Sequence, residues 1–307
     1  MNAYAIQTDQ LTRHFKSTRA VDAITLEIPS GTVFGFLGPN GAGKTTTIRL
    51  LLGLLEPSGG RATVLGFDTR TQADDIRQRC GALLEHSGLY ERLSAADNLE
   101  YFGRIWRIPA ADRSTRIQEL LTQMGLWERR GELVGTWSRG MKQKLAVARV
   151  LLHRPSLVFL DEPTSGLDPL AAAALRDDLA TLAAREGVTV FLTTHNLAEA
   201  EKLCGLVGVI RQGKLLAVAT PDDLRHRRSP QVEVYGRNFN ERALSLLRVR
   251  PEVMEVRLQN NHLTIELARQ AETAPLVSLL VGAGVQVEEV RKGQASLEEA
   301  FLDLVEG

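Results

Sequence analysis

One stretch, Gly38-Pro39-Asn40-Gly41-Ala42-Gly43-Lys44-Thr45, constrains the fold of this chain more than any other. It has the pattern G-x-x-x-x-G-K-[ST] of a phosphate-binding loop, which needs a buried strand before it and a helix after it. Residues 33–37 are apolar and typical of such a strand, and residues 46–52 are typical of the first turns of a helix. The glycines let successive N–H groups point at phosphate oxygens, and the helix N-terminus adds its dipole. The loop therefore predicts a nucleoside triphosphate site, in which Lys44 contacts the β- and γ-phosphates and Thr45 binds Mg²⁺.

The composition of the chain is that of a folded protein with no excess of either charge. It has 307 residues, of which 44% are hydrophobic and 24% charged, and its formal net charge is zero. This length suffices for two domains, and the lack of a basic excess argues against a nucleic-acid partner. Cys80 and Cys204 lie far apart, which favours reduced thiols. Because residues 1–6 lack a signal-peptide pattern and no stretch approaches about 18 uninterrupted apolar residues, we expect no membrane-spanning helix.

The order of apolar runs and turns predicts two domains. Residues 1–224 are expected to form an α/β domain with a helical insertion at about 86–155, where apolar residues recur at helical spacing. Residues 225–307 are expected to form a small α+β domain whose βαββαβ order is typical of a ferredoxin-like module. Residues 225–230 are basic and contain turn residues, and a solvated joint is a better interpretation of them than a nucleic-acid patch.

Two acidic residues follow a buried strand downstream of the loop. The apolar run 157–160 ends in Asp161 and Glu162, at the sheet edge where open α/β sheets place ligands. Hydrolysis of a triphosphate needs a held Mg²⁺ and a positioned water. Asp161 is therefore a candidate to hold Mg²⁺ with Thr45, and Glu162 to polarise the attacking water. His195, after another apolar strand, is a candidate to bind the γ-phosphate and orient Glu162, with a purely structural role as the alternative.

These motifs, in this order, resemble the nucleotide-binding subunit of an ATP-binding cassette (ABC) transporter over residues 1 to about 220. The resemblance implies an α/β P-loop NTPase cassette with a helical subdomain. It implies ATP contacts for Phe15, which would stack on the adenine, for the loop residues through Thr46, and for Asp168 in the S-G-L-D stretch that matches the D-loop. It also implies that Glu162 is the catalytic glutamate and His195 the switch histidine.

The family signature is represented by Ser138-Arg139-Gly140-Met141. In the family two cassettes stack head to tail, so Ser138 and Gly140 of one copy would cap the γ-phosphate held by the other. A serine hydroxyl at a helix N-terminus is suited to bind an anion. Trp137, Arg139 and Met141 depart from the common L-S-G-G-Q pattern, and the S-x-G-M-K form resembles the branch that powers drug, antibiotic and sodium export.

The position of the family's Q-loop holds Glu85, where a glutamine is usual. A glutamine contacts Mg²⁺ and the attacking water without adding charge. Glu85 adds an anion near the phosphates unless a metal or a base compensates it. We therefore keep two interpretations, in which Glu85 is a Mg²⁺ ligand together with Thr45 and Asp161, or the site turns over more slowly.

The resemblance implies an ATPase subunit of an efflux-type transporter. Its substrate would be a drug, an antibiotic or another small solute. Its partners would be a separate polytopic membrane subunit, gripped near Glu85, and a second copy of the chain, at the cytoplasmic face of the membrane. Residues 225–307 also resemble the tail domain of the export branch, which implies a role in regulation or dimer support. The alternatives are an importer subunit, a non-transport ABC ATPase of DNA repair or translation, and a regulatory module that hardly hydrolyses ATP.

Overall fold

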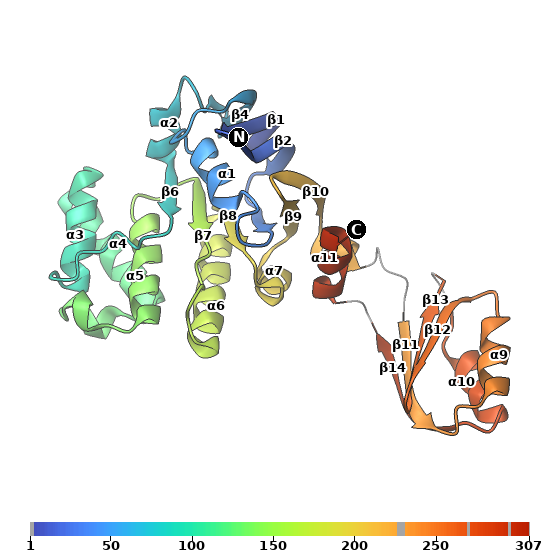
Figure 1. Cartoon of the computed structure of the whole chain (residues 1–307). Coiled ribbons are helices and arrows are strands. Elements are labelled where there is room, and N and C mark those ends of the chain that lie inside the picture. The colour runs from blue at the N-terminus through green and yellow to red at the C-terminus, as the bar shows by residue number, and fades with distance from the viewer. Residues whose placement is uncertain (1–2, 226–230, 269–270, 294–295, 307) are drawn as a thin grey trace. The chain divides into compact units, whose positions relative to one another are not determined.

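The computed structural model of the protein describes residues 3–225, 231–268, 271–293 and 296–306 (Figure 1). The contacts between residues divide the chain into two units, residues 1–220 and 221–307. The division lies at 220/221 rather than at the expected 224/225, because α8 (Pro221–Arg225) packs against α11 (Leu297–Glu306) of the second unit. Residues 226–230 of the expected joint lie outside the described residues.

A six-stranded sheet carries the phosphate-binding loop. Its order is β10-β9-β3-β8-β7-β6, and all neighbours are parallel except β10 and β9. The strands are β3 (Val33–Leu37), β6 (Cys80–Leu83), β7 (Leu157–Asp161), β8 (Thr189–Thr194), β9 (Leu206–Arg211) and β10 (Lys214–Ala219). Parallel strands covered on both faces are apolar throughout, which explains their uninterrupted hydrophobic runs. The parallel course of β3, β7 and β8 brings Gly38, Glu162 and His195 to the same edge of the sheet.

A second, antiparallel sheet covers the helix that follows the loop. Its order is β2-β1-β4-β5. The strands are β1 (Tyr4–Phe15), β2 (Thr18–Pro29), β4 (Gly59–Val64) and β5 (Phe67–Asp68). Helix α1 (Lys44–Leu51) contacts β2 and β4 of this sheet and β7 of the parallel sheet. One apolar core, which includes Ile6, Ile48 and Phe159, joins the three layers and fixes α1 behind the loop.

Helices make up the expected insertion and flank the strands that bear the acids. The insertion contains α3 (Ala95–Ile105), α4 (Ala110–Gln123) and α5 (Arg139–Leu151), which contact one another (Figure 1). The remaining helices of this unit are α2 (Ala73–Arg79), α6 (Pro169–Glu186) and α7 (Leu197–Leu203), and two short 3₁₀ turns span Trp127–Arg129 and Val134–Thr136. The prediction of a helical segment inside an α/β domain is confirmed.

The second unit has the predicted βαββαβ order. Its elements are β11 (Gln231–Arg237), α9 (Glu241–Arg248), β12 (Val253–Gln259), β13 (His262–Leu267), α10 (Ala274–Gly282) and β14 (Gln286–Gly293). The antiparallel sheet has the order β12-β13-β11-β14 and packs one face on the helices through a core that includes Val234, Leu244 and Ile265. Asn260, with φ +55°, lies in the predicted hairpin turn.

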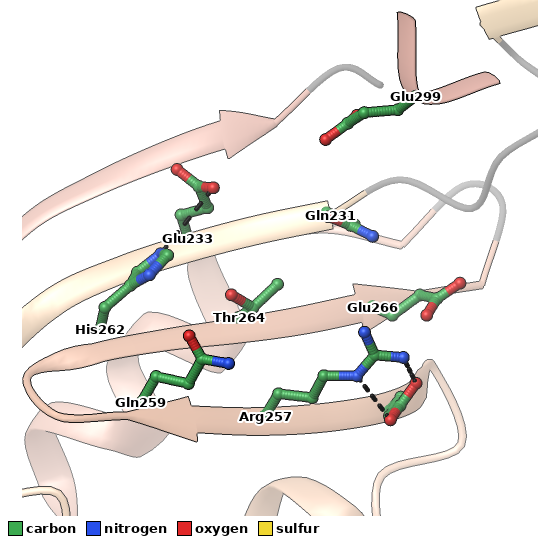
Figure 2. A pocket seen from close by; sticks show the side chains of 9 residues that line it. Gln231, Glu233, Arg257, Gln259, His262, Thr264, Glu266 and Glu299 are labelled. Atoms are coloured by element: carbon green, nitrogen blue, oxygen red, sulfur yellow. Dashed lines mark hydrogen bonds and ion pairs between the residues drawn. The ribbon is translucent and has the colours of Figure 1, made fainter. Parts of the chain in front are cut away.

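The opposite face of this sheet carries polar side chains around a cavity of about 250 Å³ (Figure 2). These side chains pair with one another: Arg257 lies 2.6 Å from Glu255, and the ring of His262 stacks on Tyr235 at a centroid distance of 4.4 Å. Such pairing is typical of the solvated face of an antiparallel sheet. Among the described residues of the whole chain, no three His, Cys, Asp or Glu side chains are grouped to hold a metal, and no helix has the length and apolar character to cross a bilayer.

Candidate active site

The backbone of the phosphate-binding loop excludes side chains at its two ends. Gly43 has φ +108°, and a Cβ there would lie 2.3 Å from the carbonyl oxygen of Ala20. A Cβ on Gly38 would lie 2.4 Å from the carbonyl oxygen of Ile210. Neither backbone oxygen can move away without displacing a strand or its turn. The glycines at both ends of the motif are therefore dictated by the surrounding sheet as well as by space for a phosphate.

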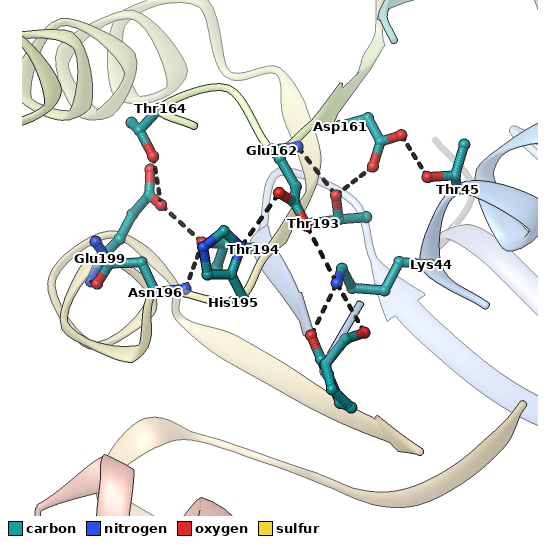
Figure 3. Close-up of polar contacts among 12 residues, drawn as sticks. Lys44, Thr45, Asp161, Glu162, Thr164, Thr193, Thr194, His195, Asn196 and Glu199 are labelled. Carbon is teal, nitrogen blue, oxygen red and sulfur yellow. Dashed lines mark hydrogen bonds and ion pairs between the residues drawn. The ribbon is translucent and has the colours of Figure 1, made fainter. Parts of the chain in front are cut away.

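Lys44 is folded into the loop, with its residue only 6% exposed. Its ammonium donates to the carbonyl oxygens of Gly38, at 2.8 Å, and Pro39, at 3.2 Å, and lies 3.2 Å from Glu162 Oε1 (Figure 3). A buried ammonium must be surrounded by oxygen acceptors. The loop thus presents a nearly desolvated positive charge at the position where the motif places phosphate oxygens.

Asp161 and Thr45 form an oxygen-only pair beside Lys44. Thr45 Oγ1 donates to Asp161 Oδ2 at 2.6 Å, and Thr193 Oγ1 donates to Asp161 Oδ1 (Figure 3). Mg²⁺ prefers hard oxygen ligands and is usually held by one or two carboxylates together with substrate phosphates, so an all-protein cage is not needed. The donor set of Thr45 and Asp161 fits Mg²⁺.

Glu162 adopts a backbone conformation that is rare for a residue with a side chain. Its φ is +49°, in the left-handed region. Its N–H donates both to the carbonyl oxygen of Thr193, at 3.1 Å, and to Thr193 Oγ1, at 3.0 Å. Its carboxylate lies between Lys44 and His195, whose Nδ1 is 3.1 Å from Glu162 Oε2 (Figure 3). Such strain costs on the order of 1–3 kcal/mol and is concentrated at functional sites.

A cavity of about 260 Å³ opens beside these residues. It is lined by Thr45, Leu84, Glu85, Ser87, Arg139, Gln143, Asp161, Glu162 and Ser165. The three residues that the sequence proposed for Mg²⁺ therefore line one space. Glu85 Oε2 also lies 3.3 Å from the guanidinium of Arg49, on α1, which is the compensating base that this carboxylate requires.

The other predicted nucleotide-binding residues lie at the ends of three different elements. Phe15 ends β1, is 41% exposed, and has the guanidinium of Arg13 at 4.7 Å from its ring centroid. Ser138 accepts the N–H of Met141 as the N-cap of α5, as predicted. Asp168 is the N-cap of α6, where its side chain accepts the N–H of Ala171 at 2.9 Å.

The signature segment reaches the cavity beside Thr45 through Arg139. Gly140 lies near Ala171, whose Cβ would be 3.1 Å from a Cβ on Gly140. Neither Ser138 nor Gly140 is among the residues that line the cavity beside Thr45.

Three residues of the site were missed at the sequence level. Thr193 links Asp161 to the backbone of Glu162, Arg49 pairs with Glu85, and Glu199 lies behind His195. The sequence signal that could have identified Thr193 was its position at the end of an apolar run, two residues before His195. Arg49 and Glu199 have no distinguishing local pattern, because each belongs to an ordinary polar position of a helix.

Comparison with known proteins agrees with this geometry. A family model described as ABC transporter matches residues 21–165. The chain is 35% identical to the bacitracin transport ATP-binding protein of Bacillus licheniformis, over 98% of this chain and 97% of that protein. It is also 35% identical to the daunorubicin/doxorubicin resistance ATP-binding protein of Streptomyces peucetius, over 98% of this chain and 92% of that protein.

A solved structure shares the fold of the first unit. It is cbiO1 of Clostridium perfringens, part of the ABC transporter complex cbiONQ, with a TM-score of 0.68 and 25% identity over 73% of this chain and 91% of that one. The fold, the phosphate-binding loop and the two long matches all indicate the same family. The chain belongs to the ABC transporter family as an ATP-binding subunit, and in this family ATP hydrolysis powers transport.

Proposed function

We propose that this chain drives the export of a drug, an antibiotic or another small solute through a separate polytopic membrane subunit. Support comes from the two relatives, one named for bacitracin transport and one for daunorubicin/doxorubicin resistance, because both match the chain over nearly its whole length. ATP binding would close a dimer of two copies, and hydrolysis would reopen it. The second unit, residues 221–307, would support or regulate this dimer.

The observation that carries the chemistry is the contact chain from Lys44 through Glu162 to His195. Lys44 would bind the β- and γ-phosphates in place of the carbonyl oxygens and carboxylate that it now contacts. Glu162 would then be free to accept a proton from the attacking water, and His195 would orient Glu162 and contact the γ-phosphate. Thr45 and Asp161, with Glu85 as a third candidate, would hold Mg²⁺, which supplies neutralisation of phosphate charge.

A second chain would complete the site. Ser138 and Gly140 would cap the γ-phosphate held by the partner's loop, because a serine hydroxyl at the N-terminus of α5 is suited to bind an anion. Asp168 would contact nucleotide across the same interface, Phe15 would stack on the adenine, and Thr46 would bind phosphate through the N-terminus of α1.

The membrane subunit would bind beside Glu85, which places the chain at the cytoplasmic face of the membrane. Tyr90 and Tyr101, in the segment that follows, are 46% and 43% exposed and stack edge to face at 4.9 Å. Exposed aromatic side chains that are pre-ordered in this way are favoured at protein interfaces.

The test is purification of the protein in mild detergent from its own cells, with identification of the co-eluting chains. A polytopic membrane protein that is retained by the wild type and lost in Tyr90→Ala/Tyr101→Ala supports the proposal. Co-elution with ribosomes or nucleic acid would refute the transport function and favour a repair or translation ATPase. Uptake, rather than efflux, of a solute in membrane vesicles would identify an importer.

A further inference from the structure

A second carboxylate, that of Glu199, is buried behind the catalytic edge of the sheet. The residue lies in the first turn of α7 and is only 3% exposed. Its Oε2 accepts the hydroxyl of Thr164 at 2.9 Å and that of Thr194 at 2.8 Å (Figure 3). Thr164 lies in the loop that follows Glu162, and Thr194 directly precedes His195. One carboxylate oxygen thus joins the two segments that carry Glu162 and His195.

The same network holds the backbone on the far side of His195. The N–H of Asn196 donates to Thr194 Oγ1 at 2.9 Å, and Asn196 Oδ1 accepts the N–H of Glu199 at 3.2 Å. The residues on either side of His195 are therefore both tied to Glu199, one through its carboxylate and one through its backbone N–H.

Stability alone does not account for a carboxylate at this position. Burial raises the pKa of Glu199, while the Thr194 and Thr164 hydroxyl bonds oppose that shift. Its Oε1 is buried and has no hydrogen-bond partner among the residues that the structure describes. A buried carboxylate with an unsatisfied oxygen is costly, and apolar side chains of similar volume would pack the same space at lower cost.

The catalytic edge does need a rigid support. Glu162 is held at φ +49°, and its contact with His195 spans two separate segments, which follow the paired strands β7 and β8. Small displacements of reacting groups reduce rates steeply, since a shift of about 1 Å can cost about 100-fold.

We propose that Glu199 is a positioning residue for ATP hydrolysis, which sets the separation of the Glu162 carboxylate from the His195 imidazole by holding Thr164 and Thr194 together. Glu199 does not line the cavity beside Thr45 and acts through the two threonines. The inference rests on the roles proposed above for Glu162 and His195.

The test is steady-state phosphate release by the full-length chain carrying Glu199→Ala. We expect kcat to fall roughly 10- to 100-fold while KM for ATP changes less than about twofold, because the substitution misplaces the catalytic pair and leaves the phosphate-binding loop unchanged. Thr164→Val, which removes one donor at nearly constant shape, should give the same pattern with a smaller loss of kcat.

Glu199→Gln tests whether the hydrogen bonds of this side chain or its negative charge matter for kcat. Its amide oxygen can still accept both hydroxyls, so kcat should recover to within about threefold of the wild type. In His195→Ala, addition of Glu199→Ala should reduce kcat no further, because residues that act as a unit are not additive.

The matched control is Leu203→Ala, which truncates a buried side chain at the other end of α7. It should lower the melting temperature without lowering kcat at a temperature where the protein is folded. Wild-type kcat in folded Glu199→Ala, an equal loss in Leu203→Ala, or failure of Glu199→Gln to recover activity would overturn the proposal. Full activity in Glu162→Gln would refute both the role of Glu162 as base and the positioning role of Glu199. If the wild type hydrolyses ATP and Glu199→Ala has the same kcat, only the positioning role of Glu199 is refuted.

Discussion

Substitution of Glu85 by glutamine tests the unusual charge beside the phosphate site. Glu85 pairs with Arg49 at 3.3 Å, and the two side chains are 60% and 40% exposed. Exposed ion pairs contribute about 0.2–1 kcal/mol, and about 1.4 kcal/mol corresponds to a tenfold change in rate. Even complete loss of the pair should therefore change kcat/KM by no more than about fivefold. We expect Glu85→Gln to change activity less than about tenfold.

Glu162→Gln is the contrasting variant. The amide cannot accept the proton of the attacking water, so hydrolysis should be abolished while ATP binding is preserved. Steady-state phosphate release measures the first property, and binding of a fluorescent ATP analogue measures the second. Both variants replace one carboxylate with an amide of the same shape, which makes them matched controls for each other.

Arg49→Gln, alone and combined with Glu85→Gln, tests the ion pair from its other side. It leaves the Glu85 carboxylate uncompensated in the cavity, where it repels the triphosphate, so KM for ATP should rise by up to about fivefold. Glu85→Gln in the same chain should restore it. Equal losses of kcat in Glu85→Gln and Glu162→Gln would refute this reasoning, because they would show that the Glu85 carboxylate acts on the reaction itself.

Three further substitutions test the site and its supports. Phe15→Ala should raise KM for ATP about 5- to 30-fold with little change in kcat, since base stacking on an aromatic ring contributes about 1–2 kcal/mol. Arg116→Ala should lower the free energy of unfolding in urea by about 3–5 kcal/mol, because Arg116 is 2% exposed and makes bonds of 2.7 and 2.9 Å to Glu186, which would lose its buried partner. Burial lowers the pKa of His153 from 6.5 to about 4, so the folded state binds fewer protons than the unfolded chain between these values. The contribution of neutral His153 to the free energy of unfolding is present above pH 6.5 and is lost as the pH falls toward 4, by at most about 3 kcal/mol. His153→Gln should remove this part of the pH dependence, which is measured by urea unfolding.

The elements around the phosphate site were predictable because their patterns are local. The run that precedes Asp161 is β7, the capped run after Ser138 is α5, and the loop lies between β3 and α1 as its motif requires. The βαββαβ order of the second unit was confirmed for the same reason, since each strand is bounded by turn residues.

The contacts that tune the site were not predictable from local pattern. Arg49 lies on α1 and Glu85 in the segment that follows β6, so their pairing depends on how these two parts of the fold meet. Glu199 occupies an ordinary helical position, and it is buried because α7 packs on β3, β8 and α6. Tertiary packing determines which polar side chains face one another, and the sequence contains no periodicity that reports it.

The conformation of Glu162 explains how two adjacent acids serve one site. Successive side chains of a strand point to opposite faces, so two carboxylates in sequence would normally diverge. Asp161 ends β7 in register with Thr193, whereas Glu162 leaves the strand at φ +49°. Both then line the same cavity, and the Thr193 hydroxyl bridges them by donating to Asp161 and accepting the N–H of Glu162. The left-handed backbone of Glu162 therefore lets two adjacent carboxylates face the same cavity, one as the candidate magnesium ligand and the other as the candidate base.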